Sequence, residues 1–194
     1  TGLASDLEDG NIESDGEVWY RYERQEEEVT PKSKVLRTVT DVDFADGDFS
    51  KKASFFGVES VKRSQIITVT FLDTLEDRPY QTWDVSAAQD GSVLLWFDRA
   101  DGAVFIAAEG GVKANPDSSS LFRECTQLDE VNFGENFDVS DVVDFSYLFC
   151  GCNALTALDG VNGWNTGKAY DMRAMFRGCS ALEYLNANFL TIDN

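Results

Sequence analysis

The chain has 194 residues, 43% hydrophobic and 12% aromatic, enough to bury the core of one domain or of two small ones. Its 35 acidic and 16 basic side chains give a net charge of -19, which excludes a nucleic-acid partner because phosphate binding needs a basic patch. The sequence contains no histidine, so nucleophiles activated by histidine and histidine-ligated metal sites are also excluded.

Residues 1–34 form an acidic leader that is predicted to be largely loop or disordered, because it is highly charged and punctuated by Asp-Gly. Within it, "EVWYRYE" (17–23) has the aromatic and β-branched content of a strand. No stretch has the length of apolar sequence that a signal peptide or a membrane span requires. We therefore expect no direct membrane insertion by these residues.

Residues 35–114 alternate β-branched and aromatic runs with Asp-Gly, Arg-Pro and Gly-Gly breaks, which predicts a β-rich region. Its clearest element is a hairpin over 91–111, in which Ala-Asp-Gly at 100–102 supplies the turn between two apolar strands. We expect this region to be the N-terminal cap of the C-terminal part of the chain.

Residues 115–194 contain three similar units that start at Leu121, Leu148 and Met175, spaced 27 residues apart. Residues of the same type recur at three positions of the units, which we call the ladder. The ladder consists of Phe122, Phe149 and Phe176; Cys125, Cys152 and Cys179; and Leu128, Leu155 and Leu182. Such agreement in both spacing and residue type predicts stacked repeats with each ladder position in one column.

Each unit shows two periods. Apolar residues at helical spacing over 142–152 and 169–179 predict a short helix, and the Leu-x-x-Leu-x-apolar pattern after each of these segments is typical of a leucine-rich-repeat strand. The predicted fold class is therefore α/β, a leucine-rich-repeat-like solenoid of 25–27-residue repeats preceded by the β-rich cap. Because such repeats bury their apolar face only against neighbours, we expect further repeats after Asn194.

The segment "WNTGKAYDMRAMFRGCSALEYLN" (164–186) resembles the repeat of the BspA-like leucine-rich-repeat surface proteins, W-x-T-S-x-V-x-x-M-x-x-M-F-x-G-C-x-x-L-x-x-L-D. The stretch 93–131 is similar to the region before the first repeat of such proteins. The first unit departs from the pattern at Leu121 and Glu124, where the family has Met and Gly. The resemblance implies an extracellular bacterial protein, secreted or held at the cell surface, that binds protein partners on host or neighbouring cells.

A binding surface is predicted on the strands of the units, where variable residues at one repeat position would set specificity. The candidate residues at that position are Glu130, Ala157 and Tyr184. The alternative is a carbohydrate-binding β module at 35–114 on a structural repeat stalk, which would need an exposed aromatic platform. The four tryptophans are expected in the core, and a purely structural role also stays open.

The ladder cysteines are expected to be buried free thiols. Side chains on stacked rungs about 4.7–4.9 Å apart point in parallel, whereas a disulfide needs Cβ atoms about 3.5–4.5 Å apart and turned toward each other. Cys150 aligns with Arg123 and Arg177, so it is expected at the surface.

Acidic segments at 6–17 and 41–52 lack the glycine and glutamate positions of a calcium-binding loop, so no metal or other cofactor is predicted. Paired carboxylates carry little information in so acidic a chain, and no nucleophile elbow, phosphate loop or dinucleotide motif is present. We therefore predict no catalytic residue and no enzymatic activity.

Overall fold

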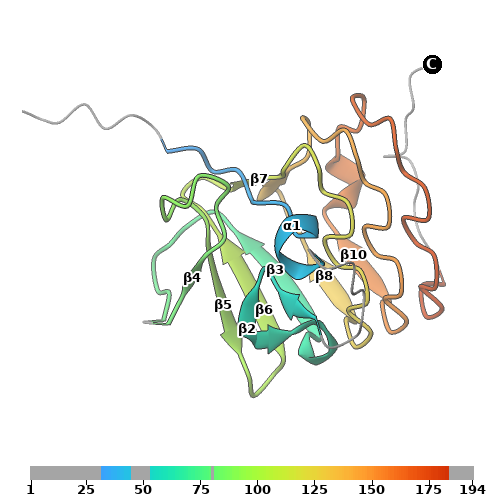
Figure 1. The fold of residues 1–194 in the computed structure, drawn as a ribbon, viewed down its shortest axis with the longest axis horizontal. Helices are drawn as coiled ribbons and strands as arrows, with labels where there is room; N and C mark the ends of the chain where they lie inside the picture. The colour runs from blue at the N-terminus through green and yellow to red at the C-terminus, as the bar shows by residue number, and fades with distance from the viewer. Residues whose placement is uncertain (1–31, 45–52, 80, 184–194) are drawn as a thin grey trace, which may run out of the picture. The chain divides into compact units, whose positions relative to one another are not determined.

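β-Strands dominate the computed structural model of the protein (Figure 1), which describes residues 32–44, 53–79 and 81–183. These residues belong to one compact unit, 32–194. The strand expected at 17–23 lies outside the described residues. The strands are β1 (Ser54–Phe55), β2 (Val58–Lys62), β3 (Thr68–Leu72), β4 (Trp83–Asp84), β5 (Leu94–Asp98), β6 (Ala103–Ala107), β7 (Val112–Lys113), β8 (Glu130–Asn132), β9 (Phe137–Asp138) and β10 (Ala157–Asp159).

The main sheet has six strands in the order β10-β8-β3-β6-β5-β4. β5 and β6 form the hairpin expected at 91–111, with Asp98 opposite Ala103 and the turn residue Gly102 at φ +65°. β3 pairs in parallel with β6 on one side and with β8 on the other, and β8 pairs in parallel with β10. The cap region and the first two units therefore share one sheet.

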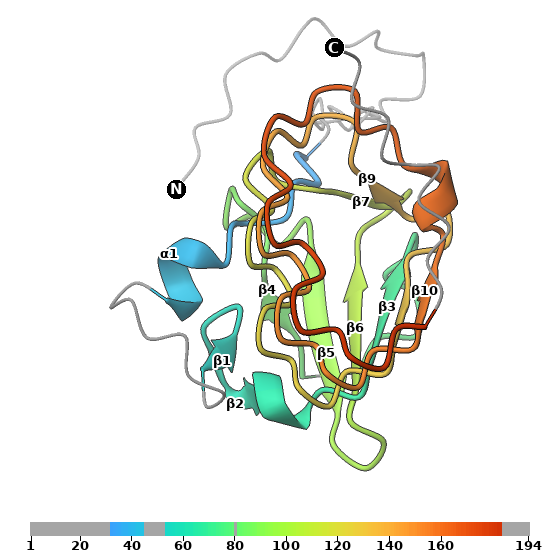
Figure 2. The same ribbon diagram turned by 90° about the vertical axis from the view of Figure 1, so that its right-hand side faces the viewer.

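From Leu121 onward the chain winds in coils of 27 residues that lie over one another, as the view along them shows (Figure 2). The backbone N–H of Phe122 donates to the carbonyl of Leu148 at 2.9 Å, and the N–H of Phe149 donates to the carbonyl of Met175 at 2.8 Å. Parallel bridges join Asp117, Asp144 and Asp171 in the same way. Each coil is thus hydrogen-bonded to the next.

The predicted α/β leucine-rich-repeat-like solenoid is wrong, because the structure is mostly β and the described residues contain almost no helix. The helical elements in the described part of the chain are α1 (Thr40–Asp43) and the 3-10 turns η1 (Arg63–Gln65) and η2 (Val161–Gly163). The segments 142–152 and 169–179, predicted as helices, are series of turns, and no leucine-rich-repeat solenoid is evident.

The turns explain why the pattern imitates a helix. Hydrogen bonds such as Leu148 N–H to the Phe145 carbonyl, at 3.2 Å, close four-residue turns that bring apolar residues three apart to the same side. At the third position of these turns the backbone is left-handed, with φ of +58° at Tyr147 and +82° at Gly151. A continuous right-handed helix cannot contain such residues. The intervening N–H groups donate to the neighbouring coil instead.

One apolar core runs from the cap through the coils. Its centre is the phenylalanine column of the ladder, in which the ring centres of Phe122 and Phe149 lie 5.2 Å apart and those of Phe149 and Phe176 lie 5.4 Å apart. Trp164 is also buried, and its ring lies 4.9 Å from that of Phe133. Aromatic stacking repeated from coil to coil therefore accompanies the backbone ladder.

Candidate interaction surface

The side of the six-stranded sheet that faces away from the core forms a continuous surface, which we call the outer face. Residues paired across strands project to the same side, so pairing defines its rows. The first row is Asp98, Ala103, Thr68, Glu130 and Ala157, and the second is Trp96, Phe105, Thr70, Asn132 and Asp159. The alternate residues Leu95, Val104, Val69 and Val131 are fully buried on the core side. Figure 2 shows α1, β1 and β2 on the opposite side of the coils from β3 and β10.

An aromatic pair lies at one end of the second row. The rings of Trp96 and Phe105 are stacked, with centres 5.5 Å apart and an angle of 14° between their planes. Both side chains are half-buried, and the row continues through Thr70 and Asn132, which are also half-buried. An aromatic platform beside hydrogen-bonding side chains is typical of a surface that binds rather than one that is only solvated.

The charge of the outer face has one sign. Asp98, Glu130 and Asp159 are exposed, and the two rows contain no lysine or arginine. A third row beside the aromatic pair consists of Asp84, Leu94, Ala107 and Leu72, of which Ala107 is fully buried and the two leucines are half-buried. Leu94 also lines a shallow hollow of about 650 Å³ together with Leu75, Glu76, Asp77, Arg78, Pro79 and Thr82. The outer face therefore combines apolar area with separated carboxylates.

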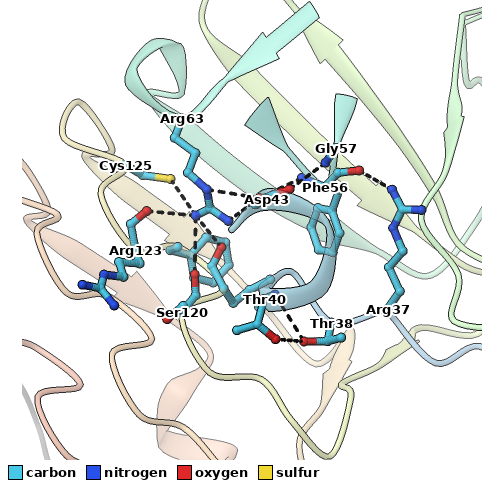
Figure 3. Close-up of polar contacts among 12 residues, drawn as sticks. Arg37, Thr38, Thr40, Asp43, Phe56, Gly57, Arg63, Ser120, Arg123 and Cys125 are labelled. Carbon is cyan, nitrogen blue, oxygen red and sulfur yellow. Dashed lines mark hydrogen bonds and ion pairs between the residues drawn. The ribbon is translucent and has the colours of Figure 1, made fainter. Parts of the chain in front are cut away.

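A buried polar junction between Arg63 and Asp43 lies inside the protein (Figure 3). Both side chains are fully buried and form an ion pair, and the guanidinium carbon of Arg63 lies 4.7 Å from the ring centre of Phe44. The carboxylate of Asp43 also accepts hydrogen bonds from the backbone N–H groups of Phe56 and Gly57, at 3.1 and 2.6 Å. The pair therefore fixes α1 and the β1–β2 turn against each other.

Arg63 also ends the stack of coils. Its Nη1 donates to the carbonyls of Leu121 and Arg123, each at 2.9 Å. In the second coil, the equivalent carbonyls are those of Leu148 and Cys150. They accept hydrogen bonds from backbone N–H groups of the first coil. The first coil has no such predecessor, and the arginine side chain supplies the missing donors. Since its polar contacts are all with the protein itself, this junction is structural rather than a binding site.

The thiols of the ladder are partnered and weakly acidic. The Sγ of Cys152 donates to the carbonyl of Phe122, and that of Cys179 to the carbonyl of Phe149, both at 3.1 Å. Burial raises the pKa of Cys125 and of Cys179 to about 11, and raises that of Cys152 well above its ordinary value. All three are free thiols, and they stay protonated near neutral pH, which makes them poor nucleophiles.

Cys150 was expected at the surface and is instead buried, with 9% of its surface exposed. Its alignment with Arg123 and Arg177 was misleading because a long side chain at that position reaches solvent while its backbone is enclosed between coils. Cys150 is a free thiol as well.

The predicted binding residues Glu130 and Ala157 lie next to each other on the outer face, and both are exposed. Tyr184 lies outside the described residues. Of the remaining ladder positions, Leu128 and Leu155 are fully buried, and Leu182 is half-buried. The sequence therefore located one part of the outer face, while Trp96, in the aromatic pair at the other end of the rows, was expected in the core.

Metal binding and membrane crossing find no support in the described residues. No group of three or more Cys, Asp or Glu side chains there is arranged to hold a metal ion, and no helix is both long and apolar enough to cross a membrane. The strongest carboxylate perturbation is at Asp141, where hydrogen bonds from Lys113 and Lys168 lower the pKa to about 2. Asp141 thus links the cap to the coils by surface ion pairs.

The sequence did not reveal the role of two groups of residues. Arg63 and Asp43 gave no signal, because a buried arginine cannot be told from a surface one by residue type alone. Trp96 was expected in the core together with the other tryptophans, and Phe105 was not singled out, because the run "VLLWFD" (93–98) is apolar throughout and no alternation marks which side faces out. Extending the predicted hairpin register to the pair would have placed both on one face.

A family model described as "Mycoplasma protein of unknown function, DUF285" matches residues 116–191. The match covers the coils and leaves out the cap. It is compatible with a BspA-like surface protein and with a place at the cell surface, and it does not specify leucine-rich repeats. Comparison with curated proteins and with solved structures found no significant match.

Proposed function

We propose that this chain is an adhesin-type module of a bacterial surface protein, which binds a protein on a host or neighbouring cell through its outer face and catalyses no reaction. The observation that carries the proposal is the continuity of that face. It extends over five strands, from the aromatic pair in the cap hairpin to Glu130 and Ala157 in the coils. The family match supports the surface location, and the protonated thiols argue against nucleophilic catalysis.

The test is binding of the fluorescently labelled chain to intact animal cells and intact bacteria, before and after mild protease treatment of the cells. We expect binding that is lost after proteolysis and reduced by Trp96→Ala. Tyr170→Ala is the matched control, because Tyr170 is 79% exposed and lies off the six-stranded sheet. Binding that falls equally in both variants, or in neither, would contradict the role of the outer face.

A carbohydrate ligand is the second candidate. The stacked, half-buried rings of Trp96 and Phe105, followed by Thr70 and Asn132, offer the combination of flat apolar surface and hydrogen-bonding groups that a sugar ring requires. Binding that survives proteolysis of the cells, is removed by glycosidases and depends on Trp96 would support this candidate over the first.

A further inference from the structure

The charges of the outer face define the chemistry of its partner. Its three exposed carboxylates, Asp98, Glu130 and Asp159, belong to three different strands and are separated by uncharged side chains. None of them forms an ion pair with a basic side chain within the described residues. By contrast, Asp141 and Glu59, on other parts of the surface, are both paired with lysines. The outer face thus presents negative charge that no basic side chain of the described residues pairs with.

The aromatic pair, like the carboxylates, favours a positively charged partner. The faces of stacked aromatic rings carry partial negative charge and attract a guanidinium or an ammonium group. Asp98 lies on the same side of β5 as Trp96 and two residues along, so a cation over the rings is also close to a carboxylate. The protein uses this combination internally, where Arg63 contacts both Asp43 and the ring of Phe44.

We propose that the outer face binds a basic, extended segment of a partner protein, with arginine or lysine side chains on Asp98, Glu130 and the Trp96–Phe105 pair. This inference rests on the proposed function and adds the partner's chemical class. The net charge of -19 draws such a segment from solution, and apolar side chains between its basic residues cover Leu72 and Leu94.

The test measures binding of two peptides to the full chain by fluorescence anisotropy at low and at physiological salt. The first peptide alternates arginine with valine, and the second replaces each arginine with neutral citrulline. We expect the arginine peptide to bind, its affinity to fall as salt increases, and the citrulline peptide to bind at least about tenfold more weakly.

Two charge variants separate the outer face from general attraction. Asp98→Asn/Glu130→Gln removes two carboxylates from the outer face, and Glu59→Gln/Asp138→Asn removes two exposed carboxylates that lie off the six-stranded sheet, with the same change in net charge. We expect the first to weaken the arginine peptide about fivefold and the second less than about twofold. Trp96→Ala is expected to weaken it about fivefold as well. Equal effects of the two double variants would overturn the proposal.

Different results would refute the basic partner alone and the binding role of the outer face as a whole. If the citrulline peptide binds as tightly as the arginine peptide and Trp96→Ala weakens both, the outer face binds peptides but the choice of a basic partner is wrong. If neither Trp96→Ala nor the outer-face double variant changes binding to any peptide or to intact cells, both the basic partner and the proposed function are refuted.

Discussion

Replacing Arg63 by methionine tests the claim that one side chain ends the stack of coils. Methionine has similar length and is apolar, so it can occupy the space beside the rings of Phe44 and Phe55. The substitution removes the ion pair with Asp43 and the two donors to the carbonyls of the first coil. All these groups remain buried, and their interactions are lost together.

The expected cost comes from the groups that lose their partners. Removing one partner of a buried ion pair costs about 3–5 kcal/mol, because the other charge stays out of water. Each buried carbonyl that loses its donor costs a further ~1–3 kcal/mol, although entry of water reduces the sum. We expect Arg63→Met to lower the free energy of unfolding by about 4 kcal/mol or more, a large part of the ~5–15 kcal/mol of an ordinary domain.

The assay is urea unfolding followed by tryptophan fluorescence, with Arg99→Met, at an exposed turn residue, as the control. The change should be much smaller when Asp43→Asn is already present, since replacing Arg63 then leaves no buried carboxylate without its partner. A loss below about 1 kcal/mol, or the same loss with and without Asp43, would refute this account of the junction.

Three further predictions concern the coils. Gly160→Ala should lower the free energy of unfolding by about 3 kcal/mol, because φ is +86° there and a Cβ atom would lie 2.3 Å from a backbone oxygen. Gly163→Ala is the control: a Cβ atom there has open space around it, so the variant should be nearly neutral in the same urea assay. In alkylation followed by mass spectrometry, Cys152 should stay unlabelled at pH 8 in the native protein. The half-buried Cys179, with a pKa of about 11, should label faster as the pH rises. Rapid labelling of Cys152 would contradict its burial. The Asp141 carboxyl has a pKa of about 2 when folded and ~3.9 when unfolded, so its stabilising effect is present above pH 4 and lost as the pH falls toward 2. Asp141→Asn should therefore be less stable than the wild type near neutral pH and lose less stability over that acid range, and parallel acid-unfolding curves would argue against the ion pairs.

The repeat length was readable from the sequence, but the backbone conformation was not. Residues three and four apart share a side both in a helix and in a series of tight turns, so the spacing of Phe145, Leu148 and Cys152 fits either. Gly151 and Gly178 were the available clue, since a glycine inside a predicted helix is unfavourable and both residues are left-handed. Tyr147 gives no such sign, and its left-handed conformation accompanies hydrogen bonds to the next coil, which no local pattern contains.

The binding surface was predictable only as far as the repeat reaches. Glu130 and Ala157 were found because equal repeat positions lie side by side in stacked coils. The extension of their row onto Thr68 depends on β3 entering the sheet between β6 and β8, a parallel pairing across more than 60 residues of sequence. Nothing in the composition of β3 specifies that neighbour. The cap was therefore predicted either as a covering element or as a separate carbohydrate-binding module, and not as part of one surface shared with the coils.

The direction of the hydrogen bonds between coils explains why arginine, and no other residue, suits the junction. Along 120–124 and its equivalents, alternate N–H groups of each coil donate to the following coil, so this segment of the first coil offers acceptors to the cap. Arginine has five donors in a planar arrangement and no acceptor, whereas lysine concentrates its donors on one atom and amides present both kinds of group. Because Arg63 begins the 3-10 turn η1 that leads into β3, the contacts that close the stack also set the position from which β3 joins β6 to β8. The buried junction thus anchors the chain directly before the strand that joins the rows on which the proposed binding depends.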